Sequence, residues 1–135
     1  MGIGLQSSGN FLVTDVAGIN EGPTTLTYPT LLSHDVQVWD REIIYVQCKV
    51  TGEAATNALG CMFRFVASAD GVNFTTEYFL ELEVLMLGTA PVCKGWHVNV
   101  TGIHSLRLQQ LENLESVVGR AALAINARWG KSYGQ

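Results

Sequence analysis

The chain alternates apolar and polar residues with a period of two, and the pattern recurs in one segment after another. In 44–50, the residues Ile44, Val46, Cys48 and Val50 occupy every second position, with Tyr, Gln and Lys between them. Successive side chains of a β-strand point to opposite faces, so this pattern predicts a strand with one buried face. A chain built of such segments has to bury those faces against one another.

The same alternation, interrupted by turn residues, continues along most of the chain. The expected strands are 11–16, 24–28, 36–39, 44–50, 61–68, 77–85, 95–100, 105–111 and 120–129. Taken alone, 121–127 also suits a helix because Ala is the strongest helix former, but Gly119 and Gly130 bracket the alternation and favour a strand. Eight or nine short strands with regular turn signals predict an all-β fold, an antiparallel β-sandwich or a barrel.

A hairpin over 60–86 is the clearest local prediction. The pair Asp70-Gly71 lies between its two strands and suits a turn that needs a positive φ. The second strand is expected to place Tyr78, Leu80, Leu82 and Val84 inward, and Glu77, Glu81 and Glu83 outward. The prolines Pro23, Pro29 and Pro91 are expected between strands, where a missing N–H does least harm.

The domain organisation is expected to be simple, because no linker, repeat or low-complexity tract divides residues 1–135. The first ten residues lack periodicity, as do the last few, 131–135. These ends are interpreted as an N-terminal arm and a short C-terminal tail. Each is either a frayed end or a strap that orders on a neighbouring subunit.

Composition excludes several classes of protein. With 8 Lys+Arg, 12 Asp+Glu and a net charge of −4, the chain lacks the clustered basic residues of a nucleic-acid-binding module. Hydrophobic residues make up 47%, too many for a disordered chain. Polar residues interrupt every apolar stretch, so no transmembrane helix is expected, and the start shows no signal peptide, which predicts synthesis in the cytoplasm.

The shortage of charge also bears on partners. Charged residues make up 15% of the chain, whereas ordinary soluble domains have about 25%. Part of the surface is therefore expected to be covered in an oligomer or an assembly. The alternative is a monomer whose exterior is rich in Ser, Thr, Asn and Gln.

Residues that carry chemistry are few, and no cofactor or metal site is predicted. Cys48, Cys61 and Cys93 lack metal-binding spacing. Cys48 and Cys61 are expected to face inward, and free thiols are favoured over a disulfide because nothing indicates an oxidising compartment. Cys93 has Lys94 beside it but no evident base, so no enzymatic role is predicted.

The histidines raise one hypothesis of a metal site. His97 and His104 flank an expected turn at 101–102, so antiparallel pairing would bring them near each other. The alternative, favoured on frequency, is two unrelated surface histidines. His34 and Asp35 are adjacent on an expected loop or strand, where neighbours point to opposite faces, so they do not form an acid–base pair.

Two surface features suggest ligands. The row Glu77, Glu81 and Glu83 is either a calcium or glycoside-binding row or the solvated face of a strand, and the solvated face is favoured. Three tryptophans suggest a sugar-stacking platform: Trp39, expected to be exposed, and Trp96 and Trp129, expected in the core or an interface.

Two segments together carry a family resemblance. Residues 65–74, with Ser68-Ala69-Asp70-Gly71 and Phe74, and residues 96–108, with Gly102-Ile103 and Leu106-Arg107-Leu108, resemble small β-sandwich structural proteins of tailed bacteriophages. The resemblance implies a jelly-roll-like sandwich that decorates the outside of a phage head. No functional residue carries over with it.

The resemblance, with the composition, gives the expected function and partners. The protein is expected to be a non-enzymatic capsid decoration protein on the virion surface, bound to the major capsid protein and, as a homotrimer, to copies of itself. The residues expected at the interface are Ile3, Leu5, Phe11, Trp39, Trp129 and Tyr133. The alternatives are a carbohydrate-binding module with a glycan ligand, and a neck, tail or fibre component.

Overall fold

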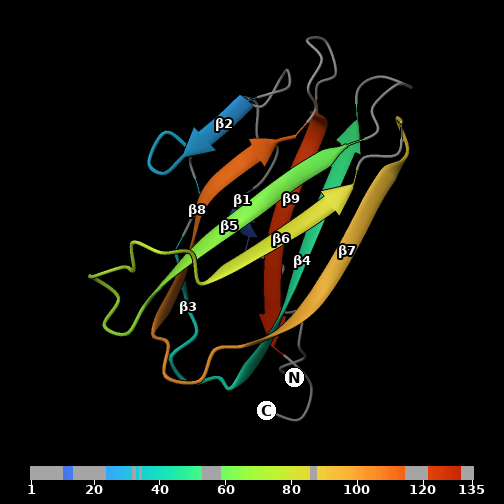
Figure 1. The fold of residues 1–135 in the computed structure, drawn as a ribbon. Coiled ribbons are helices and arrows are strands. Elements are labelled where there is room, and N and C mark those ends of the chain that lie inside the picture. Colours follow the sequence, from blue (N-terminus) through green and yellow to red (C-terminus); the bar gives the residue numbers. More distant parts are fainter. Residues whose placement is uncertain are drawn as a thin grey trace.

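The computed structural model describes residues 11–13, 24–31, 33, 35–52, 59–85, 88–114 and 122–131, with the backbone alone for 11–13, 24 and 122–131. Nine strands form within these residues (Figure 1). They are β1 (Phe11–Val13), β2 (Thr24–Thr27), β3 (Val36–Gln37), β4 (Ile43–Gly52), β5 (Gly60–Ser68), β6 (Leu80–Leu85), β7 (Pro91–Asn99), β8 (Ser105–Asn113) and β9 (Ala122–Lys131). No described segment forms a helix of the length and apolar character that crossing a bilayer requires.

The strands form two antiparallel sheets. One sheet has the order β1-β9-β4-β7, and the other has the order β2-β8-β5-β6, with β3 also pairing β8. The first strand therefore pairs with the last and the second with the next to last, which is the strand order of a jelly roll. The predicted fold class, an antiparallel jelly-roll-like β-sandwich, is confirmed. The segment 122–131 is a strand, as the alternation predicted.

The core lies between the two sheets. Exposure alternates along the whole of β4, whose buried positions include Ile44, Val46 and Val50. The facing sheet contributes Phe63 and Phe65 from β5, both fully buried. Fully burying one such side chain stabilises a fold by roughly 1.5–3 kcal/mol, so the alternating pattern accounts for the packing of the sandwich.

The cysteines are free thiols, in agreement with the prediction. Cys48 and Cys61 lie in the core, and burial raises the pKa of the Cys48 thiol far above its usual range. Cys93 is exposed on β7, and its Sγ accepts a hydrogen bond from Nε2 of Gln47 at 2.8 Å.

The edge strand beside β8 consists of two parts. β2 pairs with the second half of β8 and β3 with the first half. Between them the chain leaves the sheet at Tyr28, whose N–H donates to the carbonyl of Gln109. The departure places Leu31, 1% exposed, in the core, while Oγ of Ser33 donates to the carbonyl of Leu108 at 2.8 Å.

One strand prediction is wrong at its start. The strand expected over 77–85 begins at Leu80, because β5 pairs with β6 only from Phe65 opposite Leu80 to Gly60 opposite Leu85. Tyr78 was expected to face the core, but it precedes the paired segment and is 41% exposed. The rest of the prediction holds: Leu82 and Val84 are buried, and Glu77, Glu81 and Glu83 are exposed.

The strand β7 begins earlier than the alternation suggested. Pro91 was expected between strands, but it is the first residue of β7, a position on an edge strand that a missing N–H allows. Lys94 stands opposite the buried Cys48 and so belongs to the inner face. Its Nζ lies 5.7 Å from the ring centroid of Trp96, which packs against the core as predicted.

Candidate functional site

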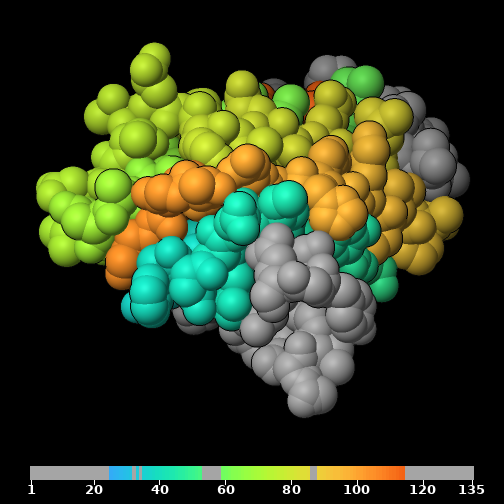
Figure 2. Space-filling model, turned by 90° about the horizontal axis from the view of Figure 1, so that it is seen from below, coloured from blue at the N-terminus to red at the C-terminus, as the bar shows by residue number. Residues whose placement is uncertain are grey.

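The loop between β5 and β6, residues 69–79, concentrates exposed apolar side chains. It carries Val72, Tyr78 and Phe79, which are 78%, 41% and 38% exposed. In Figure 1 the loop extends beyond the sheets, and Figure 2 shows it in yellow-green projecting at the left of the molecule. We call this segment the 69–79 loop.

The carboxylate of Asp70 organises the tip of the 69–79 loop. Its Oδ1 accepts hydrogen bonds from the backbone N–H of Val72 and of Asn73, both at 2.8 Å, and from Oγ of Ser68 at 2.9 Å. Its Oδ2 accepts a further one from Nδ2 of Asn73 at 2.8 Å. The backbone and side-chain donors of Asn73, with Val72 and Ser68, hold the pKa of Asp70 well below its usual range.

Glycine is required beside that carboxylate. Gly71 has φ +83°, which side-chain-bearing residues rarely adopt, so the prediction from the Asp-Gly pair is confirmed. A Cβ at this position would lie 2.8 Å from two atoms of the His104 ring. The loop tip therefore packs directly on His104, whose Nδ1 lies 2.7 Å from Oγ of Ser105.

The second half of the loop returns across the end of β5. The N–H of Thr75 donates to the carbonyl of Ala67 at 2.9 Å, and the N–H of Ala67 donates to Oγ1 of Thr75 at 3.3 Å. The N–H of Phe79 donates to the carbonyl of Phe65 at 2.8 Å. The loop is thus bonded to the sheet on both sides of Tyr78.

Arg107 connects the 69–79 loop to the segment between β2 and β3. Its guanidinium carbon lies 3.9 Å from the ring centroids of both Tyr28 and Phe74. Its Nε and Nη2 donate to the two carboxylate oxygens of Asp35, at 2.8 and 2.9 Å. A bidentate pair together with two aromatic contacts holds a side chain firmly. Arg107 therefore connects three separate segments and leaves little of itself for a ligand.

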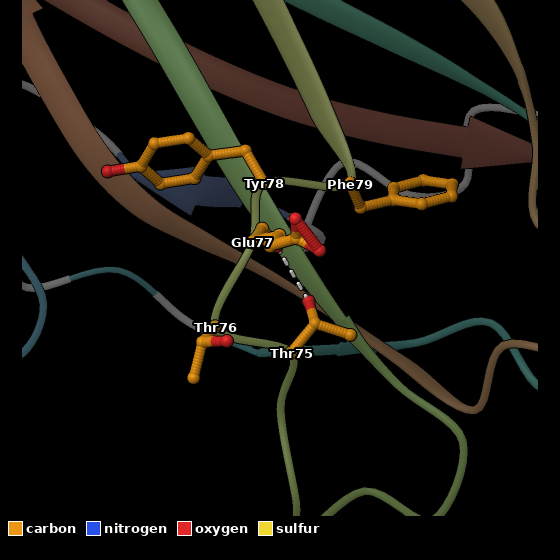
Figure 3. Close-up of a pocket in the computed structure, with 5 residues that line it drawn as sticks. All are labelled: Thr75, Thr76, Glu77, Tyr78 and Phe79. Atoms are coloured by element: carbon orange, nitrogen blue, oxygen red, sulfur yellow. Dashed lines mark hydrogen bonds between the residues drawn. The ribbon is translucent and has the colours of Figure 1, made fainter.

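A shallow hollow of about 370 Å³ lies on the loop, lined by Thr75, Thr76, Glu77, Tyr78 and Phe79. Figure 3 shows the rings of Tyr78 and Phe79 projecting in opposite directions, with the carboxylate of Glu77 between them. The hydroxyl of Thr75 is already engaged, because it donates to the backbone carbonyl of Glu77 at 2.9 Å. The hollow thus presents two aromatic rings, the hydroxyl of Thr76 and one carboxylate.

A polar network lies beside Tyr78 on the outer face of the sheet. Arg64 donates from Nε to Glu81 at 2.7 Å, and from Nη1 to Glu112 at 2.8 Å and to Gln110 at 2.9 Å. Its guanidinium carbon lies 5.7 Å from the Tyr78 ring centroid. Partial burial acts to lower the pKa of Arg64, but the hydrogen bonds to Glu112 and Glu81 outweigh it and raise the pKa.

Among the residues predicted for an interface, Trp39 alone has a side chain that the structure describes. Trp39 is 65% exposed, as predicted, on the connection between β3 and β4. Phe11 lies in β1 and Trp129 in β9, where the backbone alone is described, and Ile3, Leu5 and Tyr133 lie outside the described residues. His34 also lies outside the described residues.

The two remaining histidines have different neighbours. The His97 ring contacts Tyr45, with ring centroids 5.2 Å apart, whereas His104 lies under Gly71. In the part of the chain that the structure describes, no group of three or more His, Cys, Asp or Glu side chains could hold a metal ion.

The sequence analysis named Phe74 and Arg107 only as parts of the family resemblance, without a role, and it did not single out Arg64. Both arginines stand at outward positions of strands, a pattern that marks a polar sheet face and says nothing about its partners. The partners of Arg107 come from 72 residues away in the chain at Asp35, and those of Arg64 from up to 48 residues away at Glu112. The only local signal was the Asp70-Gly71 turn.

Comparison with known proteins gives no family. No protein-family model matches the chain, and no curated protein matches it. Among solved structures, it is similar to the K1 cleaved adhesin domain of Lys-gingipain from Porphyromonas gingivalis, with 13% identity over 98% of this chain and 89% of that chain and a TM-score of 0.43. It is also similar to a carbohydrate-binding module of Cellvibrio mixtus lichenase 5A in complex with cellotriose, with 11% identity over 91% of this chain and 99% of that chain and a TM-score of 0.37. With TM-scores below 0.5, these are distant likenesses.

Proposed function

We propose that this protein is a non-enzymatic structural subunit of a virion, a capsid decoration protein that binds the outside of a phage head. The observation that carries the proposal is the 69–79 loop, which combines a backbone fixed by hydrogen bonds with exposed apolar side chains at Val72, Tyr78 and Phe79. Exposed apolar groups on a fixed, projecting segment are typical of a contact with another macromolecule.

The form of the site favours a protein partner over a small substrate. Ligand and substrate sites are usually concave and bury most of the ligand surface. The 69–79 loop instead projects from the molecule, and its hollow is shallow and lined by a single segment. A projecting surface contributes to binding by entering a complementary surface, as in contacts between the subunits of an assembly. The same geometry supports the non-enzymatic part of the proposal.

The experiment is a measurement of solution mass and of binding to heads. Light scattering of the purified protein gives its oligomeric state, for which we expect a trimer. Co-sedimentation with heads assembled from the major capsid protein of the same genome tests binding, and we expect a fixed stoichiometry at saturation. A protein that stays entirely in the supernatant contradicts the proposal. A chain lacking residues 1–10 tests the strap separately, because unchanged head occupancy excludes that role.

A second candidate function is carbohydrate binding, which the network beside Tyr78 favours. A sugar ring has an apolar C–H face, which packs on an aromatic ring, and hydroxyl groups at its rim that need hydrogen-bonding partners. Tyr78 offers a half-exposed ring, and Glu81 and Glu112 offer carboxylate oxygens held in place by Arg64. The net negative charge of these three groups favours a neutral sugar. The similar module from Cellvibrio mixtus is in complex with cellotriose.

Glycan-array screening, with cellotriose included, separates the two candidates. Binding that Tyr78→Ala abolishes and Trp39→Ala preserves supports a sugar site at the network. Arg64→Gln sharpens the result, because it removes the cation that orients both carboxylates while the Tyr78 ring stays. An array without any bound glycan, together with stoichiometric binding to heads, rejects the sugar site and keeps the decoration role.

A further inference from the structure

The chemistry of the hollow and its surroundings says which kind of surface the 69–79 loop meets, given the proposed role as a decoration protein. Exposing a large apolar side chain forgoes roughly 1.5–3 kcal/mol of burial, and fixing the backbone of one residue costs roughly 1–2 kcal/mol. The loop bears both costs, since Val72 is 78% exposed while its N–H is bonded to Asp70. Binding to a partner recovers the burial without a further ordering cost.

The hollow has the groups that a long cationic side chain needs. Lys and Arg have an apolar stem that packs on apolar surface and a charged end group that pairs with a carboxylate or stacks on an aromatic ring. The rings of Tyr78 and Phe79 flank the carboxylate of Glu77 (Figure 3). With about 370 Å³, the hollow has room for one such side chain. Glu77 is the one charged residue of the lining, and the hydroxyl of Thr75 is already engaged with its backbone carbonyl.

The charges around the hollow select the sign of the partner. Glu77 in the loop and Glu81 and Glu83 on β6 are all exposed. Glu81 is paired with Arg64 at 2.7 Å, whereas Glu77 and Glu83 have no ion pair among the described residues. Like charges facing each other across an interface are strongly unfavourable. An acidic partner is therefore disfavoured, and a basic one is complementary.

We infer that the hollow at 75–79 receives a lysine or arginine side chain from a basic surface of the major capsid protein, with Val72 adding an apolar contact to the same surface. This inference rests on the proposed function. It makes Glu77, Tyr78 and Phe79 the residues that determine specificity for the partner. It also predicts that the affinity for heads falls as the salt concentration is raised.

The first experiment needs no heads. The ¹⁵N-labelled protein is titrated with N-acetyl-arginine amide and, separately, with N-acetyl-glutamine amide, a polar compound without the charge. We expect the amide resonances of 75–79 to move with the arginine compound alone, and to stay in place in Glu77→Gln. Glu42→Gln is the matched control, since Glu42 is another exposed glutamate but lies on the connection between β3 and β4. The inference is overturned if the amide resonances of 75–79 do not move when the arginine compound is added.

The second experiment measures affinity for heads. Glu77→Lys reverses the central charge, and we expect about tenfold weaker binding from it, as for a charge pair lost at the centre of an interface. Val72→Asp is expected to weaken binding as well, and Glu42→Lys to leave it unchanged. Because these side chains are exposed, the variants are expected to keep the wild-type unfolding midpoint, which is measured alongside.

The outcomes separate the two proposals. If the wild type binds heads and Glu77→Lys binds equally well, the inference is wrong and the decoration role stands. If the wild type does not bind heads, the decoration role fails, and a titration with shifts confined to 75–79 still supports a hollow for cationic side chains. If only the sugars of a glycan array bind the loop, the basic-partner inference is overturned.

Discussion

The core and the 69–79 loop are both ordered, but by opposite means. In the core, side chains such as Phe63 and Phe65 are fully buried, and order follows from apolar packing between the sheets. In the loop, apolar side chains such as Val72 face water, and order follows from hydrogen bonds to Asp70 and from the stack on Arg107. Hydrogen bonds and the half-buried Phe74 ring on Arg107 hold the loop, whereas the side chain of Val72 is left largely in water.

This difference indicates where selection for function acts. A core residue is explained by the stability that its burial provides. An exposed apolar residue on a fixed loop has no such explanation, because a polar residue there would serve stability at least as well. The two regions should therefore respond differently to substitution: the core through global unfolding, and the loop through local order and binding.

The largest effect is expected in the core. Phe63→Ala removes a fully buried ring from β5, and such a change costs about 3–5 kcal/mol in the free energy of unfolding. Urea unfolding followed by tryptophan fluorescence measures the loss. A loss below about 1 kcal/mol would mean that the two sheets do not depend on this packing for their stability.

The second largest effect is expected at Arg107, which connects the 69–79 loop to the sheet. Arg107→Ala removes two aromatic contacts and a bidentate ion pair, and we expect a loss of about 2 kcal/mol. Arg107→Lys keeps the charge without the planar fork, so it should recover only part of the loss. Amide hydrogen exchange should rise at 72–75 in Arg107→Ala. Unchanged exchange there would show that the loop is ordered independently of the stack.

A smaller effect, with a pH dependence, is expected for Asp70→Ala. The pKa of Asp70 is lowered in the folded state, so its carboxylate contributes stability at pH values above the unfolded pKa of about 4. That contribution is lost as the pH falls further, towards the folded pKa. The difference in Tm between the wild type and Asp70→Ala should be constant from pH 5 to 7 and shrink in acid. A difference that grows in acid has the wrong sign for this assignment.

The smallest effect is expected for Trp39→Ala. Trp39 is 65% exposed, and substitutions of exposed residues usually change the free energy of unfolding by less than about 0.5 kcal/mol. Loop hydrogen exchange should also stay unchanged. Reduced head binding in this variant would add the connection between β3 and β4 to the contact surface.

The strands of the two sheets could be predicted from the sequence, because the alternation of apolar and polar residues within each strand indicates which face is buried. The alternation corresponds directly to the buried face along β4 and along β5 as far as Phe65, whereas the residues 65–68 are buried on both faces. The alternation does not show at which residue the pairing of a strand begins or ends. Tyr78 is in phase with Leu80, Leu82 and Val84, yet it lies before the first paired residue of β6.

The candidate site could be predicted only in part. Asp70-Gly71 gives the turn locally, because a carboxylate and a positive φ shape the backbone within a few residues. The contacts of Arg64 and Arg107 depend on the register between β5 and β8. In that register, Arg64 lies opposite Gln110, and Arg107 lies opposite Val66. Register is determined by the whole sheet, so no local pattern shows it.

The neighbouring edge strands β6 and β7 have a consequence for how this molecule associates. Unpaired strand edges invite other chains to add to the sheet, which leads to open-ended aggregation. Here Lys94 stands on the inner face of β7 and Pro91 begins that strand, while Glu81 and Glu83 flank the edge of β6. Charge and proline make such edges poor templates for a further strand. Copies of this protein are thus steered away from fibre-like stacking and left to associate through side chains.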